Sequence, residues 1–499
     1  MSITQTAATG VDRRLGATGM QLETAVAFVG CLVALVADTQ SLSLIPLLPR
    51  LEQDYSLSPS QASWALSAIT LAGAAWIPTL TRLGDRLGMR RLVLASLVLS
   101  VAGNLLCAVV HGFPLFVASR AILGLSASVP LIYAILRARS TSERRTNLGI
   151  GILTTAIGAG AGVSFLISGA VIEANGSVRT VFWVMTALSV AALALTWWLL
   201  PDTQIRSRDP IDWGGAVGIS AGLVCIVLAI TEGNTWQWSS GQVIGLFIAG
   251  AVIFALWALY ETRQPYPLIN VRRVFNRIST PAFIIGGLCG AVAIYANLVQ
   301  VTYLELPKQV VGYGLSLSVL QCAYILCVTS AAAVAGGFLA APLITRVGPG
   351  PVMAGAGVLM AAGFFGLAYG HDQIWQYVVA NICWGAAFSF GYAGAYAAFL
   401  QVSGAAEAAM YSSANSVFTA AFPALGPGIF TAILTSHSIP HTPIPDPGVF
   451  RQLWLYAAFT GIAILVLALV VRRPTFVPAD AAESVISADS DREQRQELA

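Results

Sequence analysis

Two charged residues, Asp38 and Arg120, interrupt long apolar stretches of this 499-residue chain. An ionisable side chain in such a stretch is energetically costly and by default points to function. Apolar surroundings favour a protonated carboxyl group, whereas a nearby guanidinium favours the charged carboxylate. We therefore expect that movement of Arg120 switches Asp38 between binding and releasing a proton. The alternative is a static pair that hydrogen-bonds the backbone or each other and locks the fold.

The positions of the two residues along their apolar stretches would let them meet. Asp38 lies about 10 residues, or roughly 15 Å of helix, from the end of its stretch. Arg120 lies about 6 residues, or roughly 9 Å, from the corresponding end of its own stretch. Glu305, near the end of a later apolar stretch, is a second candidate proton or cation site. A solvated charge at a helix end is the alternative interpretation of Glu305.

The composition places these residues in a membrane protein. Hydrophobic residues make up 57% of the chain, charged residues only 10%, and the mean hydropathy is +0.76. These values exclude a soluble globular protein. With about 20 apolar residues needed for each crossing, the sequence predicts an all-α membrane protein with 14 transmembrane helices. Their expected ranges are 23–48, 61–80, 92–111, 114–137, 147–172, 180–200, 213–232, 241–260, 280–304, 314–341, 350–369, 374–400, 412–435 and 452–472.

The distribution of basic residues predicts the orientation. Arginines concentrate in every second connection and in both tails, whereas the other connections hold only Arg50, Arg179, Lys308 and Arg451. The positive-inside rule then places both termini in the cytoplasm of a multi-pass protein of the cell membrane. The net charge of +3 reflects this topology, and we expect no nucleic-acid partner.

Two longer connections divide the helices into groups of six, two and six. We expect two pseudo-symmetric six-helix halves that flank an inserted helix pair, an organisation that places a binding site between the halves. The predicted segments are an N-terminal tail (1–22), a first half (23–200), the inserted pair with its linkers (201–279), a second half (280–472) and a C-terminal tail (473–499).

Motifs for enzymatic or metal chemistry are missing from the sequence. Seven cysteines fall inside predicted helices, and His437 and His441 have ligand spacing but no further Cys or His partner nearby. The sequence contains neither a Walker A loop nor a recognisable catalytic motif. We therefore expect no metal site, no cofactor and no enzymatic activity.

The segment 81–91, TRLGDRLGMRR, carries the most specific motif of the chain. It resembles the signature Gly-x-Leu-Ala/Gly-Asp-Arg-x-Gly-Arg-Lys/Arg of the major facilitator superfamily, from which Thr81 and Met89 depart. In that family the aspartate interacts with arginines and with the positive end of a facing helix, which is worth up to about 1–2 kcal/mol, and favours the outward-open state. The resemblance implies a gating role for Asp85, Arg86, Gly88, Arg90 and Arg91. The alternative is a cluster of arginines that only sets the topology.

Two further segments resemble the fourteen-helix drug:proton antiporter branch of that family. In the first helix, Ala37-Asp38-Thr39 followed by Leu47-Leu48-Pro49 is similar to Leu-Asp-x-Thr followed by Ala-Leu-Pro. In the fourth helix, the segment RAILG, from Arg120 to Gly124, is similar to Arg-x-x-Gln-Gly.

The fifth helix matches the same branch only in part. Gly151, Gly160 and Gly169 fit its glycine pattern, and small residues permit close helix packing. Ser164, Phe165 and Ser168 replace Gly, Pro and Gly. Without the proline, we expect this helix to lack a kink.

The resemblance also implies where a substrate would bind. Facilitator cavities are lined by the first and fourth helices of each half, which here include 280–304 and 374–400. The candidate substrate-binding residues on these helices are Asn297, Gln300, Tyr303, Asn381, Trp384, Tyr392 and Tyr396. Aromatic walls with few hydrogen-bonding groups suit a small amphipathic or lipid-like substrate, although bundle packing or an interfacial belt would use the same residue types.

The function implied by the resemblance is proton-coupled export of small hydrophobic or amphipathic molecules by alternating access. Protons and membrane lipids would be the further partners, and we expect a monomer. A lipid or glycolipid exporter, or an importer, of the same fold is the alternative. A nontransporting receptor or assembly subunit is the alternative from another class, and a long soluble domain would be expected for it.

Overall fold

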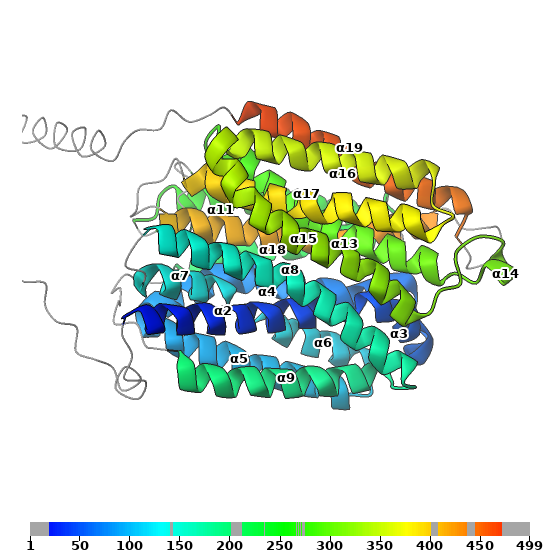
Figure 1. The fold of residues 1–499 in the computed structure, drawn as a ribbon, viewed down its shortest axis with the longest axis horizontal. Coiled ribbons are helices and arrows are strands. Elements are labelled where there is room, and N and C mark those ends of the chain that lie inside the picture. Colours follow the sequence, from blue (N-terminus) through cyan, green and yellow to red (C-terminus); the bar gives the residue numbers. More distant parts are fainter. Residues whose placement is uncertain are drawn as a thin grey trace, which may run out of the picture.

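The computed structural model describes residues 19–139, 143–200, 212–233, 235–265, 267, 269, 271, 275–400, 408–436 and 445–471. Long helices that lie side by side dominate this part of the chain (Figure 1). We call the end of the bundle where α2 begins and α4 meets α5 the near end. The opposite end, where α3 ends and α4 begins, is the far end.

The helices fall into three groups along the chain. The first group is α2 (Gly19–Leu42), η1 (Ile45–Leu47), α3 (Leu48–Tyr55), α4 (Pro59–Leu87), α5 (Met89–Val109), α6 (Phe113–Gly124), α7 (Val129–Arg139), α8 (Glu143–Glu173) and α9 (Val178–Leu199). The second is α10 (Trp213–Thr231) and α11 (Gly241–Glu261). The third is α13 (Ser279–Glu305), α14 (Lys308–Val311), α15 (Val319–Val347), α16 (Pro349–Tyr369), α17 (Ile374–Leu400), α18 (Ala408–Ser436) and α19 (Pro447–Val470).

Among the described residues, 12 helical spans are long and apolar enough to cross a membrane. This confirms an all-helical, multi-pass membrane fold. Two further helices of 29 residues each, α4 and α18, pack against these spans without being among the 12. The count of fourteen crossings, the segment boundaries and the cytoplasmic placement of the termini stay predictions.

Two predicted helices prove to be broken, and in each case a proline explains the break. The predicted helix 23–48 ends as α2 at Leu42, before Pro46, and the predicted helix 114–137 divides after Gly124, before Pro130. A proline has no backbone N–H, and its ring clashes with the carbonyl four residues earlier. Apolar character alone made these stretches look continuous, so the sequence-based expectation was wrong on this point.

The predicted loop at 81–91 is also different in the structure. Helix α4 continues through most of the motif to Leu87, and α5 begins at Met89, so that Gly88 is the only residue between them. Gly88 has a φ of 102°, a backbone conformation that favours glycine. The junction of α15 and α16 repeats this arrangement at Gly348, with a φ of 91°.

The same helix packing occurs twice. In the first group, α2 packs on α8, α4 on α6 and α5 on α9; in the third group, α13 packs on α18, α15 on α17 and α16 on α19. Between the groups, α8 packs against α15 and α4 packs against α18. These two contacts are equivalent, because each joins the second predicted crossing of one group to the fifth of the other. We therefore refer to the two groups as the first and second halves.

The inserted pair attaches to one of the two seams between the halves. Helix α10 packs against both α4 and α18, and α11 packs on α10. The indole N–H of Trp64 donates to Glu232 Oε1 (2.7 Å), and the hydroxyl of Ser220 donates to the carbonyl of Ala75 (3.3 Å). The helix pair thus sits beside the seam between α4 and α18.

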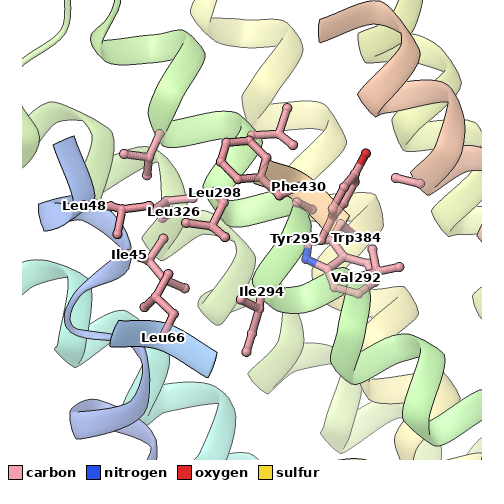
Figure 2. Close-up of a cluster of buried hydrophobic side chains, with 14 of the residues drawn as sticks. Ile45, Leu48, Leu66, Val292, Ile294, Tyr295, Leu298, Leu326, Trp384 and Phe430 are labelled. Atoms are coloured by element: carbon pink, nitrogen blue, oxygen red, sulfur yellow. The ribbon is translucent and has the colours of Figure 1, made fainter. Parts of the chain in front are cut away.

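The halves share an apolar core at the far end. Ile45 and Leu48 of the first half lie beside Leu298 and Leu326 of the second half in one buried cluster (Figure 2). The near-end part of the first half has a separate buried cluster, to which, among the described residues, only the first half contributes, for example with Val33. Apolar burial therefore joins the two halves mainly at the far end.

Two matched glycines allow the closest approach of helices within each half. A Cβ atom on Gly124 would overlap the carbonyl oxygen of Ile69, and one on Gly385 would overlap that of Thr329. We expect Gly124→Ala and Gly385→Ala to lower the free energy of unfolding by about 1–3 kcal/mol each, because the backbones must separate. Thermal unfolding in detergent measures the loss.

A matched control is Gly366→Ala, because a Cβ at this position of α16 meets nothing within 4 Å. This variant should unfold at the temperature of the unmodified protein or above it, since alanine favours a helix over glycine. Equal unfolding temperatures for Gly124→Ala and Gly366→Ala would contradict the packing argument.

Candidate functional site

A cavity of about 250 Å³ lies between the two halves. Its walls come from α2, α4, α6 and α8 of the first half and from α13, α15, α17 and α18 of the second. These helices correspond to the first, second, fourth and fifth predicted crossings of each half. A ligand in this cavity would therefore contact both halves at once.

Among the described residues that line the cavity, Asp38 is the only one with an acidic or basic side chain. It stands on α2, one turn before the helix ends at Leu42. Helix α8 approaches it closely, because a Cβ on Gly160 would lie 2.9 Å from Cβ of Asp38. The structure thus places the acid predicted from the sequence in the central cavity.

Two serines that replace motif residues connect α8 by hydrogen bonds to α2 and to the residue that follows its end. The hydroxyl of Ser164 donates to the carbonyl of Thr39 (2.8 Å), and that of Ser168 donates to the carbonyl of Ser43 (2.8 Å). Helix α8 runs from Glu143 to Glu173 without interruption, and the absence of a kink stays a prediction. The serines supply hydrogen bonds that glycine could not make at these positions.

The second half contributes an aromatic wall. Trp384, Phe388 and Tyr392 line the cavity from α17, with ring centroids 5.9 Å apart for the first pair and 4.9 Å for the second. Asn297 lines it from α13, and its Oδ1 has no hydrogen-bond partner. The structure therefore brings together Asp38, Asn297, Trp384 and Tyr392 from the residues expected to bind protons or substrate.

The other four candidate substrate-binding residues do not line the cavity in this conformation. Gln300 is fully buried, and neither of its amide atoms has a partner. Asn381 donates to the carbonyl of Ile325 (3.0 Å). The hydroxyl of Tyr303 donates to Asp372 (3.3 Å) in an aromatic cluster, and the ring of Tyr396 packs 6.1 Å from that of Tyr133.

Arg120 is completely buried and bonds to backbone instead of to Asp38. Its Nε donates to the carbonyl of Ala65 (2.9 Å), and its Nη1 and Nη2 donate to the carbonyls of Gln40 (2.7 Å) and Ser41 (3.3 Å). The expected pair of Arg120 with Asp38 is not formed in this conformation. Bonds to the backbone are the geometry of the alternative interpretation, and the coupling role of Arg120 stays a prediction.

A buried polar network that the sequence analysis missed surrounds Gln40. Its Nε2 donates to the hydroxyl of Ser126 (2.9 Å), and its Oε1 accepts from Ser100 (2.7 Å) and Asn104 (3.1 Å). Ser189 on α9 joins through its hydroxyl. The sequence could have indicated this network, because the polar residues Ser100 and Asn104 lie four residues apart on one face of a predicted helix.

Glu305 and the gating motif lie away from the cavity. Glu305 is the last residue of α13, and its buried Oε1 has no hydrogen-bond partner. The side chain of Asp85 lies outside the described part of the structure, and Arg86 and Arg91 are exposed. Arg90 donates from Nε to the carbonyl of Leu200 (2.6 Å) and from Nη2 to that of Trp197 (2.7 Å), at the end of α9.

A family model described as the Major Facilitator Superfamily matches residues 30–336. The chain belongs to the major facilitator superfamily. This facilitator fold explains the paired halves and the central cavity. The family consists of transporters, so the protein is a membrane transporter and not an enzyme.

The facilitator is similar to several drug-resistance proteins. It is 27% identical over 252 residues to multidrug resistance protein 3 of Bacillus subtilis, and the match covers 48% of each chain. It is 25% identical over 392 residues to a methyl viologen resistance protein of Salmonella typhimurium, which covers 77% of this chain and 76% of the relative. The match spans about half the length of the Bacillus relative. These similarities support the resemblance to the drug:proton antiporter branch.

Solved facilitator structures have the same fold. A human organic anion transporter superposes with a TM-score of 0.61 over 91% of this chain and 100% of that chain, at 14% identity. A peptide transporter superposes with a TM-score of 0.63 over 92% of this chain and 99% of that chain, at 15% identity.

The Gln40 network yields a test of the site's architecture. In Gln40→Met, the buried polar groups of Ser100, Asn104 and Ser126 lose their shared partner. The three groups keep their bonds to Ser189, to the carbonyl of Ser100 and to the carbonyl of Leu123. Each bond lost to Gln40 is worth about 0.5–1.5 kcal/mol, so we expect a lower thermal unfolding temperature in detergent. The same exchange at exposed Gln53 should have little effect. Equal unfolding temperatures in the two variants would mean that the network contributes nothing to stability.

Proposed function

We propose that this facilitator is a proton-coupled exporter of small hydrophobic or amphipathic molecules. The observation that carries the proposal is the isolated Asp38 carboxyl group in a cavity that both halves line. A single ionisable group at the contact of two moving halves is well placed to bind a proton in one state and release it in the other.

The walls of the cavity favour a neutral or cationic amphipathic substrate. Aromatic faces on Trp384 and Tyr392 attract both apolar groups and cations. A deprotonated Asp38 would add an attraction for positive charge, whereas an anionic substrate would be repelled by it. The names of the relatives, which include multidrug and methyl viologen resistance proteins, agree with such a range.

Exchange of protons for a cationic substrate across the membrane follows if both compete for Asp38. A protonated Asp38 no longer attracts a cation, so cation binding favours release of the proton and protonation favours release of the cation. Alternating access then requires that the shared core at the far end opens while the near end closes. With both termini in the cytoplasm, the far end would face outward.

The Asp38 proposal is tested by Asp38→Asn in proteoliposomes, with ethidium as the probe. We expect ethidium-driven proton flux to disappear, because the amide cannot bind and release a proton at this position. In the unmodified protein ethidium binding should weaken as the pH falls, whereas in the variant it should be independent of pH. Asp54→Asn, the same exchange at an exposed position of α3, is the control and should behave as the unmodified protein.

Two results would overturn this assignment. Unchanged coupling in Asp38→Asn would move the proton site to Glu305 or indicate uniport. Transport of a fluorescent lipid but not of ethidium by the unmodified protein would favour the lipid or glycolipid transporter of the same fold.

The gating role of the motif at 81–91 is a second part of the proposal. We expect Asp85→Asn to shift the equilibrium towards the inward-facing state and to slow turnover, with little change in ethidium affinity. Distances between spin labels across the near end measure the populations. Identical distance distributions in variant and unmodified protein would remove Asp85 from the gate.

Protons, membrane lipids and the amphipathic substrate are the proposed partners of this facilitator, which we propose to be a monomer.

A further inference from the structure

Arg120 and Asn381 occupy matched positions in the two halves. Gly124 on α6 faces the carbonyl of Ile69 on α4, and Gly385 on α17 faces the carbonyl of Thr329 on α15. These contacts align the fourth crossing of one half with that of the other. Arg120 lies four residues before Gly124, and Asn381 lies four residues before Gly385.

Both residues make the same hydrogen bond to the second crossing of their half. Arg120 Nε donates to the carbonyl of Ala65 (2.9 Å), four residues before Ile69. Asn381 Nδ2 donates to the carbonyl of Ile325 (3.0 Å), four residues before Thr329. The match extends to the partner atom, so the two positions are structurally equivalent.

The first crossings of the two halves differ at the level of these residues. In the second half, α13 continues without a break to Glu305, so its carbonyls are bonded within the helix. In the first half, Leu42 is the last residue of α2, and Pro46 lies in the short η1 segment that follows. The last carbonyls of a helix have no partner within that helix.

Arg120 satisfies carbonyls at the broken end of α2. Its Nη1 and Nη2 donate to the carbonyls of Gln40 (2.7 Å) and Ser41 (3.3 Å). The Gln40 carbonyl also accepts a longer bond from the hydroxyl of Ser43 (3.4 Å). A guanidinium has five donors in a planar fork and stays charged, so it can serve several carbonyls and also interact favourably with the negative end of a helix dipole. Asn381, in the half whose first helix is unbroken, makes only the one bond, and its buried Oδ1 has no partner.

We propose that Arg120 is a positioning residue that caps the broken first crossing and thereby sets the place of Asp38, two residues before the first capped carbonyl. Arg120 acts on the acid through the backbone and not by pairing with its carboxylate. The proposal rests on the proposed role of Asp38 for its transport measurement, but the cap itself is independent of that role.

A double-mutant cycle with Pro46→Ala tests the cap. Arg120→Asn installs the residue that the second half uses and should lower the thermal unfolding temperature by several degrees. Pro46→Ala removes the ring that interrupts the helix, so that α2 can continue and its own N–H groups can reach Gln40 and Ser41. We expect Arg120→Asn/Pro46→Ala to recover at least half of the lost unfolding temperature. Equal losses with and without Pro46→Ala would overturn the cap.

The pH dependence of ethidium binding separates positioning from electrostatics. Arg120→Asn should shift the midpoint of this dependence, and the double variant should return the midpoint towards that of the unmodified protein although the positive charge is still missing. Arg120→Lys should resemble Arg120→Asn, because one ammonium group cannot reproduce the fork. Restoration by lysine, or a midpoint in the double variant equal to that of Arg120→Asn, would show that the charge itself acts on Asp38.

The controls distinguish failure of the cap from failure of the transport proposal. Arg346→Asn, the same exchange at an exposed position of α15, should change neither the unfolding temperature nor the midpoint. If the unmodified protein does not bind ethidium, the proposed function fails for this probe. The unfolding temperatures of the cycle would still decide whether Arg120 caps α2.

Discussion

A bilayer core contains no water to bond a free peptide group, so any break in a membrane helix must be satisfied from within the protein. The break after Leu42 imposes this constraint on the first half. Arg120 supplies donors for carbonyls before the break, and Ser168 supplies a donor for the carbonyl of Ser43 after it. The neighbouring helices are thereby fixed around the turn of α2 that carries Asp38.

The two halves use one scaffold for different purposes. Matched glycines, helix junctions and seams recur in both, so the geometry of the cavity follows from the repeat. The chemistry of the cavity does not repeat. The first half contributes Asp38 on a broken helix, whereas the second contributes Asn297 and the aromatic wall around Trp384 on unbroken helices.

Much of the fold could be predicted because hydropathy reports burial in lipid, and most helix ends lie within a few residues of their expected positions. Hydropathy does not register a missing N–H, so the breaks before Pro46 and Pro130 were not predicted. Asp38 was found because a lone charge stands out in an apolar stretch. The partners of Arg120 were not predicted, because its hydrogen bonds go to peptide carbonyls, which every residue has. The residue types in the sequence therefore do not indicate them.

Peptide carbonyls are present whatever the side chain, and this affects how the first half can evolve. Substitutions at residues 40, 41 and 65 leave the three acceptor atoms of Arg120 in place, so these contacts tolerate sequence drift at their acceptor positions. Gln40 is restrained for a different reason, the network of its own side chain. Sensitivity to mutation should thus concentrate on the donor, Arg120. A search for covarying residue pairs would not detect its contacts, although they hold the first-half helices that line the cavity.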